Sequence, residues 1–560
     1  MYLEGINVGL VGLGSRANLV LDFGCGSGAI TIFFVKKGFT VVGCDIDPAC
    51  ESLIQGKLEC SERHRFQFMR LDAESESLPI FDKQFDLILC REVLEHIRGY
   101  QSVLRQFRAI LKKDGMLVVS CPTWLTEKLF SFFDRQWLRK SEHINVFPKG
   151  RMIAELDRHL FEVKRVEGQS FKWSLFWLLL SPIKVNHRMG NPTSHPRFVK
   201  LALRIVNAVE RMKVIDRLGN IVFPKSYFYY AKKRRPKILV IFDYEHWILG
   251  RWAKHIERIY GHEYDIRSIS MFDIAKDRKA VEQVVRDADL IHLLLPHCFD
   301  DISAIGPRAP MVTTIHHWVN WDFVSRAAEK SHEIVTGAYE WKNRLVERGI
   351  PEDRITVVHS GVEKRFFGSE APLIPPSEKI TFGFFGKFDS NENDRKGTRH
   401  LRSVVDSIRE SGYQESFRVI VSGPGWRDVI AYIEDQSIEV IYFEFTAEDD
   451  MPALYRSLDI YLMLSDVEGG PATVMEAMAS KCLVLANNIG VVIDIVQDGV
   501  NGVIVQNTAY IDIVEKMMLL KKHDLLAHEI RQRGYDFAKE HLSYDKTLEP
   551  LGNVYEKYLS

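Results

Sequence analysis

Glycines and acidic residues near the N-terminus have the spacing of a nucleotide-binding loop. Residues 20–28, VLDFGCGSG, place an apolar run directly before a glycine-rich turn. Glycine lets a ligand approach the backbone closely, and residues 29–37 can form a helix whose N-terminus faces that ligand. Asp45 ends the next apolar run, where a carboxylate can accept hydrogen bonds from both hydroxyls of a ribose. The candidate ligand-binding residues within the loop are Asp22, Gly24, Gly26 and Gly28.

A second glycine motif lies upstream and competes with this one. Gly12, Gly14 and Ala17 fit the GxGxx(G/A) pattern of dinucleotide-binding loops and follow an apolar run. A new strand is expected to begin at Leu19, however, which leaves no room for the helix that would hold the phosphates. We therefore place the nucleotide site at residues 20–28.

Another group of candidate binding residues lies in the second half, within residues 465–479, SDVEGGPATVMEAMA. Pro471 suits the first residue of a helix, and the backbone N–H groups of Gly469 and Gly470 could then bind a diphosphate at the positive end of that helix. Glu476 lies early in the helix, near enough to reach a ribose, and Glu468 lies in the loop. Upstream, the basic residues Lys387 and Lys396 could face the same diphosphate.

Three segments that alternate apolar runs with amphipathic helices must position these residues. The basic linker AKKRRPK, residues 231–237, and the proline-rich stretch SEAPLIPPS, residues 369–377, separate them. We expect units at residues 1–233, 237–368 and 378–560, the last with a helical tail beyond about residue 540. Alternating strands and helices are typical of α/β units with parallel sheets and crossover helices.

Bulk composition is that of an ordinary soluble globular protein of 560 residues. The formal net charge is −1, which removes the electrostatic argument for nucleic-acid binding. The eight cysteines form no CxxC pair, and the N-terminus lacks the order of a secretory signal, so we expect reduced thiols and a cytoplasmic location. The aromatic and apolar stretch at residues 171–183 is too short to span a bilayer. It is expected to be a buried helix or docking face, with peripheral contact to the inner face of the membrane as the alternative.

The series from Asp22 to Pro122 resembles the class I S-adenosylmethionine-dependent methyltransferases, in particular the branch with quinone and small-molecule O-methyltransferases. The resemblance rests on the glycine loop, on Asp45, on Asp72 after FQFMRLD, on FDKQFDLILCREVLEHI and on the closing LKKDGMLVVSCP. It implies that Gly24 and Gly26 contact the amino-acid part of S-adenosylmethionine, Asp45 its ribose and Asp72 its adenine.

Methylation of a hydroxyl also needs a group that removes the hydroxyl proton. His96 and His143 are the candidate bases, and the alternative for each is a structural, hydrogen-bonded histidine.

The region from about 237 to 540 resembles the retaining GT-B glycosyltransferases of family 4, the group 1 glycosyltransferases. This resemblance implies that Lys387 and Lys396 bind the donor diphosphate. It also implies that Glu476 binds the ribose and that Glu468 binds the hydroxyls of the donor sugar. In the motif TIHH, His316 would lie beside the transferred sugar, with His317 as the alternative. The glycine-rich loop that this family has after its first strand is reduced here to Gly250-Arg251, in which Gly250 is the candidate donor-binding residue. Lys387 replaces a more usual arginine.

Together the two resemblances predict three Rossmann-like units, namely a class I methyltransferase domain followed by a two-lobed GT-B glycosyltransferase. The predicted function is bifunctional: retaining transfer from a nucleotide sugar to a glycan or glycolipid, and methylation by S-adenosylmethionine of the same product. No metal is expected, because lysines and a helix dipole neutralise the leaving nucleotide. The alternatives are that one half is a non-catalytic binding or scaffold module, or that the first half is a dehydrogenase.

Overall fold

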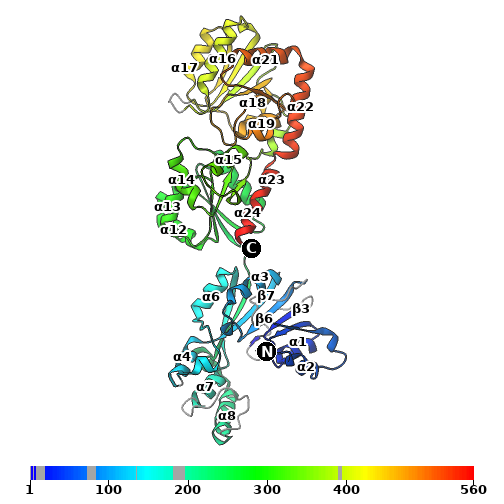
Figure 1. Ribbon diagram of the computed structural model, residues 1–560, viewed down its shortest axis with the longest axis vertical. Helices are drawn as coiled ribbons and strands as arrows, with labels where there is room; N and C mark the ends of the chain where they lie inside the picture. Colours follow the sequence, from blue (N-terminus) through cyan, green and yellow to red (C-terminus); the bar gives the residue numbers. More distant parts are fainter. Residues whose placement is uncertain are drawn as a thin grey trace. The chain divides into compact units, whose positions relative to one another are not determined.

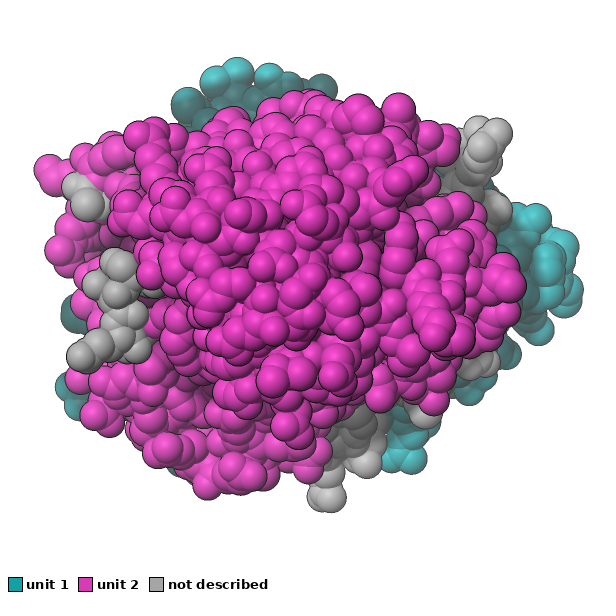
Figure 2. Space-filling view, turned by 90° about the horizontal axis from the view of Figure 1, so that it is seen from above, with its two compact units in different colours: residues 1–235 teal, residues 236–560 magenta. Residues whose placement is uncertain are grey.

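The computed structural model describes residues 2–3, 6–7, 19–71, 83–133, 135–180, 196–388 and 394–559. It divides into two compact units, residues 1–235 and 236–560, which Figure 2 colours separately. The division falls within the basic linker expected at residues 231–237. The competing motif at Gly12 and the candidate adenine-binding residue Asp72 lie outside the described residues.

Unit 1 is built on a seven-stranded sheet with the order β5-β4-β3-β6-β7-β9-β8 (Figure 1). The first five of these strands are parallel, and β9 pairs antiparallel with both β7 and β8. The strands are β3 Leu19–Phe23, β4 Thr40–Asp45, β5 Phe66–Arg70, β6 Phe85–Arg91, β7 Leu111–Pro122, β8 Phe161–Gln169 and β9 Ser226–Lys233. A separate two-stranded sheet joins β1 Tyr2–Leu3 to β2 Ile6–Asn7.

The central strands β3 and β6 are mostly apolar and buried, as expected for parallel strands that helices cover on both faces. Two core clusters result. Leu21, Ile88 and Phe107 belong to one cluster, and Val20, Leu87 and Phe34 to the other. The helices are α1 Ala29–Lys36, α2 Ala49–Gln55, α3 Tyr100–Ile110, α4 Trp124–Phe133, α5 Trp137–Lys140, α6 Lys149–Arg158, α7 Phe171–Leu180, α8 Pro196–Arg211 and α9 Lys213–Val222.

The first lobe of unit 2 has a six-stranded parallel sheet with the order β11-β10-β12-β13-β14-β15. Its strands are β10 Lys237–Phe242, β11 Asp265–Ser270, β12 Leu290–Leu293, β13 Met311–Thr314, β14 Glu333–Thr336 and β15 Ile355–Val357. Its helices are α10 Ile248–Tyr260, α11 Met271–Lys276, α12 Arg278–Asp287, α13 Phe299–Ala304, α14 Trp321–Lys330 and α15 Tyr339–Glu347.

The second lobe repeats this architecture with the strand order β18-β17-β16-β19-β20-β21, again all parallel. Its strands are β16 Ile380–Phe385, β17 Phe417–Ser422, β18 Glu439–Phe443, β19 Ile460–Met463, β20 Leu483–Asn487 and β21 Val503–Val505. Its helices are α16 Thr398–Glu410, α17 Arg427–Asp435, α18 Met451–Arg456, α19 Ala472–Ala479, α20 Val492–Ile495, α21 Tyr510–Lys522 and α22 Asp524–His541. The α/β class with three Rossmann-like units is therefore confirmed.

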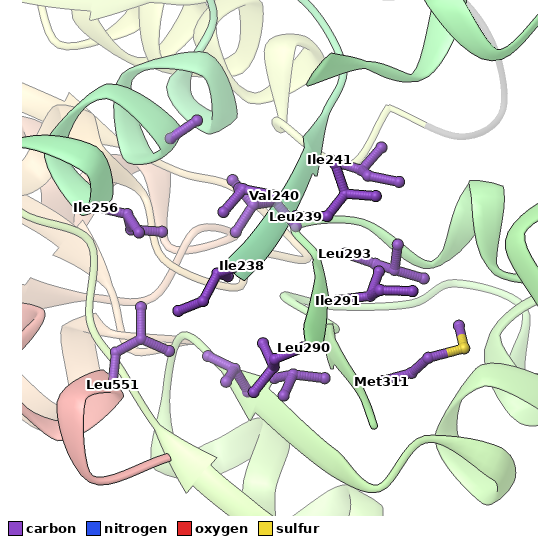
Figure 3. Packing of buried hydrophobic residues seen from close by; sticks show 14 of the residues in the cluster. Ile238, Leu239, Val240, Ile241, Ile256, Leu290, Ile291, Leu293, Met311 and Leu551 are labelled. Carbon is purple, nitrogen blue, oxygen red and sulfur yellow. The ribbon is translucent and has the colours of Figure 1, made fainter. Parts of the chain in front are cut away.

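The last two helices, α23 Tyr544–Thr547 and α24 Glu549–Leu559, lie against the first lobe rather than the second (Figure 1). Figure 3 shows Leu551 of α24 facing Ile238 and Leu290, and Tyr555 belongs to the same cluster. The sequence assigned residues 544–559 to the tail of the third unit. Their apolar side chains instead complete the core of the first lobe of unit 2.

No helix among the described residues has the length and apolar character needed to cross a bilayer. All eight cysteines lie in the described part, and none forms a disulfide.

Candidate active sites

The glycine loop after β3 has a backbone conformation that other residues rarely adopt. Gly24 has φ 78° and Gly26 has φ 49°. A Cβ atom on Gly24 would lie 2.3 Å from Cγ2 of Val93, so this glycine allows the loop to pack against the segment after β6. A Cβ atom on Gly26 would meet no described atom within 4 Å. Gly24 therefore serves packing, whereas Gly26 faces the space where a ligand can lie.

Acidic side chains hold this loop in place. Asp45, at the end of β4, accepts a hydrogen bond from the backbone N–H of Gly26 at 2.8 Å. Asp22 is buried and accepts one from the Thr31 hydroxyl at 2.6 Å, which ties β3 to α1. Gly28 directly precedes α1, so the start of that helix faces the loop. The loop, the acidic strand end and the helix N-terminus that the sequence predicted thus lie together.

His96 and His143 are 47 positions apart in sequence, and their rings lie 5.0 Å apart. Nδ1 of His96 lies 3.0 Å from the Glu142 carbonyl oxygen, and Nδ1 of His143 lies 2.9 Å from a carboxylate oxygen of Glu127. Burial lowers the pKa of His96. Each imidazole thus keeps Nε2 for another partner.

In unit 2, Glu468 follows β19 and is almost fully buried. Its carboxylate accepts a hydrogen bond from the Lys396 ammonium, and the Arg395 guanidinium lies 3.5 Å away. Burial alone would raise the pKa of Glu468, but the two cations hold it below its usual value. Trp341 of the first lobe donates to the Glu468 carbonyl oxygen at 2.7 Å, which joins this loop to the opposite lobe.

Glu476 lies on α19 and is also buried. One carboxylate oxygen accepts from Arg251 Nη1 at 3.1 Å, and the other accepts from the Tyr455 hydroxyl at 3.1 Å. Although burial alone would lower the pKa of Arg251, Glu476 raises it, so this ion pair is tightly held. Gly250 lies in the first turn of α10, where a Cβ atom would meet the Glu245 carbonyl oxygen at 2.3 Å. Gly250 therefore lets α10 start close to the preceding turn, and the next residue reaches Glu476.

His316 follows β13 and faces the same loop of the second lobe. A Cβ atom on Gly469 would lie 2.3 Å from the His316 carbonyl oxygen, so only glycine allows this close approach. Gly470 lies beside the Gly337 carbonyl oxygen, 3.7 Å from a Cβ at that position. Nε2 of His316 is buried and has no hydrogen-bond partner among the described residues. Burial lowers the pKa values of His316 and His317 to about 4, so both rings are neutral at neutral pH.

Lys387 is exposed directly after β16 and forms no ion pair with any described residue. The sequence contains two Asp-x-Asp motifs, Asp45–Asp47 and Asp287–Asp289. Asp45 and Asp47 belong to the turn after β4, where Asp45 accepts the Asp47 N–H at 3.1 Å. Asp289 accepts the Lys237 backbone N–H at 2.7 Å and so ties two strands together.

A cavity of about 340 Å³ opens beside Arg251 between the two lobes of unit 2. Its walls are charged, with basic residues outnumbering acidic ones. The lining residues are Glu245, Arg251, Lys254, His255, Arg258, Glu363, Arg365 and Glu448.

Comparison with known families gives one match in each half of the chain. The family described as "Methyltransferase domain" matches residues 10–164, and "Glycosyl transferases group 1" matches residues 374–537. The chain therefore joins a methyltransferase domain to a glycosyltransferase domain. These matches confirm the resemblance to methyltransferases in the first half and to group 1 glycosyltransferases in the second half. They also confirm the prediction of a bifunctional methyl- and glycosyltransferase.

Individual relatives divide in the same way. A ubiquinone biosynthesis O-methyltransferase of Bradyrhizobium sp. (strain ORS 278) is 29% identical over 180 residues, which cover 30% of this chain and 68% of that protein. The uncharacterized glycosyltransferase MJ1178 of Methanocaldococcus jannaschii is 24% identical over 42% of this chain and 62% of that protein. The crystal structure of Anabaena Alr3699/HepE in complex with UDP and glucose covers 58% of this chain and 100% of its own, with 14% identity and a TM-score of 0.47.

Some residues of these sites were not predicted from the sequence. Arg251 was noted only as the neighbour of Gly250, although it is the partner of Glu476. In the methyltransferase domain, the pair formed by Lys225 and Glu92, 3.0 Å apart, lies at the end of β6. These partners are far apart in sequence, so no local pattern could indicate them.

Proposed function

We propose that the glycosyltransferase transfers a sugar from a nucleotide donor with retention of anomeric configuration. Glu476 binds the donor ribose, Glu468 the sugar hydroxyls, and His316 lies beside the transferred sugar. The observation that carries this proposal is the contact of the Gly469 loop with the backbone of His316, because it brings candidate residues of both lobes to one cleft. A neutral imidazole with a buried, unpaired Nε2 can accept or donate one hydrogen bond to a sugar hydroxyl.

The leaving nucleotide diphosphate is stabilised without a metal ion in this proposal. Lys387 and Lys396 supply positive charge, and the backbone N–H groups of Gly469 and Gly470 supply hydrogen bonds at the start of α19. Lys396 and Glu468 form an ion pair with each other. In the proposed complex the donor diphosphate lies on the Lys396 side of this pair, and the donor sugar lies on the Glu468 side.

In the methyltransferase domain we propose that the glycine loop and Asp45 hold S-adenosylmethionine, with Asp72 at its adenine and Asp22 supporting the loop through Thr31. The open space at Gly26 fits a bound cofactor. The sulfonium cofactor supplies an electrophilic methyl group, and the protein positions an acceptor hydroxyl in line with it. His96 and His143 lie at the same end of the sheet and are the groups proposed to act on the hydroxyl proton.

The acceptor is proposed to be a glycan or glycolipid that both domains modify, at the inner face of the membrane. Helices α8 and α9 support membrane contact because they combine exposed apolar side chains with six basic and two acidic residues between positions 196 and 222. The exposed apolar residues are Leu201, Ile205, Met212, Val214, Ile215, Leu218, Ile221 and Val222.

Sedimentation of the full chain with vesicles tests the membrane contact. We expect binding to vesicles of anionic phospholipid, and loss of binding after the double change Val214→Asp and Leu218→Asp. Leu525→Asp, at an exposed position of unit 2, is the control. Equal sedimentation of the double variant would refute the contact.

A donor-hydrolysis screen with a panel of nucleotide sugars tests the glycosyltransferase proposal. We expect Glu476→Ala and Lys396→Ala to lower hydrolysis of the best donor at least tenfold, whereas the exposed controls Glu515→Ala and Lys521→Ala leave it unchanged. If both active-site variants hydrolyse the donor as the wild type does, the site is misplaced. If no donor binds or is hydrolysed, this half is a scaffold module.

The shared substrate is tested separately with the methyltransferase activity. The full chain should transfer methyl from S-adenosylmethionine to the glycosylated product. Methylation of a quinone, with the glycosylated product ignored, would refute the shared substrate.

A further inference from the structure

The donor site of the glycosyltransferase domain combines two segments that are far apart in sequence. Lys396 lies two positions before α16, and Glu468 lies in the loop after β19. The backbones of the two segments are hydrogen-bonded, because the N–H groups of Asp466 and Val467 donate to the Arg395 carbonyl oxygen at 2.8 and 3.2 Å. The position of the lysine relative to the glutamate therefore depends on how the loop after β19 is held.

Asp466 joins this loop to its surroundings through its side chain. One carboxylate oxygen accepts a hydrogen bond from Asn507 Nδ2 at 2.6 Å, and His400 Nε2 lies 3.2 Å from the same oxygen. The other oxygen accepts from the Arg399 guanidinium. Arg399 and His400 belong to the first turn of α16, whereas Asn507 lies between β21 and α21. One carboxylate thus ties the loop after β19 to two other segments of the second lobe.

His400 is held in one orientation within this network. Its ring is buried, and Nδ1 lies 2.9 Å from the Tyr510 hydroxyl oxygen. An ionised carboxylate only accepts hydrogen bonds, so Nε2 of His400 carries a proton, and Nδ1 of the neutral ring then accepts from the Tyr510 hydroxyl. Because donors from separate segments hold the Asp466 carboxylate, the loop after β19 cannot shift without loss of these hydrogen bonds.

We propose that Asp466 is a positioning residue for the donor diphosphate and that it acts through Lys396. This inference rests on the proposed glycosyltransferase function, in which Lys396 binds the diphosphate and Glu468 binds the sugar hydroxyls. The two side chains form an ion pair with each other, so a shift of the loop after β19 would move both. Side chains that bind a ligand must be held within about 0.5 Å of the productive geometry by the residues behind them. Asp466 supplies that support.

The direction of the effect on diphosphate binding separates positioning from electrostatic repulsion. Asp466 carries a negative charge in the loop whose backbone contacts Arg395, next to Lys396. Removal of a negative charge close to an anion site, taken alone, strengthens binding of the anion. Loss of positioning has the opposite effect, because Lys396 no longer faces the diphosphate. The variant Asp466→Ala should therefore bind a nucleoside diphosphate more weakly than the wild type, against the electrostatic expectation.

Calorimetry of the full chain with UDP, GDP and ADP tests this role, and the tightest of the three is used for every variant. We expect Lys396→Ala to weaken binding about 10–100-fold, the effect of losing one charge-assisted hydrogen bond. Asp466→Ala should weaken binding about tenfold through the misplaced lysine. In the Lys396→Ala background, Asp466→Ala should change the affinity by less than about twofold. Unchanged or tighter binding by Asp466→Ala, or the same weakening in both backgrounds, would overturn the proposal.

Asp459→Ala is the matched control. Asp459 directly precedes β19, at the end opposite Asp466, and accepts the Thr381 backbone N–H at 2.9 Å. Loss of this structural hydrogen bond should lower the fraction of chains that bind, and so the measured stoichiometry, but not the affinity of those chains. Equal weakening by Asp459→Ala and Asp466→Ala would overturn the positioning role. His400→Gln, which can still donate to Asp466, should bind more tightly than His400→Leu. Wild-type affinity in His400→Leu would exclude the link through His400.

The same titrations separate this inference from the proposed function. If Lys396→Ala weakens binding and Asp466→Ala does not, the positioning role falls and the donor site stands. If no nucleoside diphosphate binds the wild type, or if Lys396→Ala binds as the wild type does, the proposed diphosphate site falls and the positioning role falls with it. If unit 2 of Asp466→Ala does not fold, Asp466→Asn decides, because it keeps the shape of the side chain but places an amide N–H₂ group against the donors. Wild-type affinity in Asp466→Asn would then overturn the proposal.

Discussion

The buried histidine between the two glycosyltransferase lobes should make the stability of unit 2 depend on pH. Burial lowers the pKa of His316 to about 4, whereas an unfolded chain has a histidine pKa of about 6.5. Between these two values the unfolded state binds a proton that the folded state does not. The free energy of unfolding therefore rises with pH in this window. The contribution of His316 to it is lost as pH falls from about 6.5 toward 4.

The size of this effect follows from the window. Between pH 6.5 and 5 the lost stability is about 2 kcal/mol for His316, at about 1.36 kcal/mol per pH unit. For unit 2, residues 236–560, 2 kcal/mol corresponds to a fall of about 3 °C in melting temperature, at about 2.1 cal/mol/K of unfolding entropy per residue. His317, whose pKa is also lowered to about 4, adds to the loss in the same direction.

Thermal melting of the full chain at pH 7 and pH 5 measures this effect. The transition that S-adenosylmethionine shifts upward belongs to the methyltransferase domain, which identifies the other transition as unit 2. In His316→Gln, we expect the fall in melting temperature between the two pH values to be smaller than in wild type by about 3 °C. His262→Gln, at an exposed position, should behave as wild type. The reasoning is refuted if His316→Gln and wild type lose the same amount.

Four further outcomes follow from individual residues and their contacts. Gly24→Ala should lower the melting temperature of the methyltransferase transition more than Gly26→Ala, because only the former places a Cβ atom 2.3 Å from Val93; equal shifts would contradict this. Gly26→Ala should instead weaken S-adenosylmethionine binding at least tenfold in calorimetry, and unchanged affinity would place the cofactor elsewhere. Glu476→Gln should weaken binding of the best donor by about 10–100-fold, the effect of losing one charge-assisted hydrogen bond. Arg251→Met should destabilise unit 2 by about 3 kcal/mol, because it leaves the Glu476 carboxylate without its cation; a melting temperature unchanged from wild type would exclude a strong pair.

Local patterns were enough to predict the fold and part of each site. The glycine loop before α1 and the Gly-Gly-Pro turn before α19 are contiguous in sequence, and both lie directly before the helices that the sequence led us to expect. Short apolar runs between them predicted parallel sheets because strands covered on both faces are apolar throughout.

Contacts between distant segments could not be predicted in this way. Arg251 and Glu476 are 225 positions apart and meet only when the two lobes face each other. His96 and His143 were candidates individually, but the contact between their rings depends on a loop whose path no periodicity determines. The docking of α24 on the first lobe is a similar case, since an amphipathic helix shows that it has a partner but not which one.

The return of the chain to the first lobe affects how the two lobes of unit 2 can move and when the first lobe can finish folding during translation. The two crossings between lobes run side by side, because the Val362 N–H donates to the Leu542 carbonyl oxygen at 2.7 Å and Val362 bridges Ser543. A body held by two adjacent connections can rotate about them but cannot swing freely, so we expect the cleft to open and close as a hinge. The first lobe, moreover, lacks Leu551 and Tyr555 until these two residues leave the ribosome. Its core therefore becomes complete only after the entire second lobe has been made.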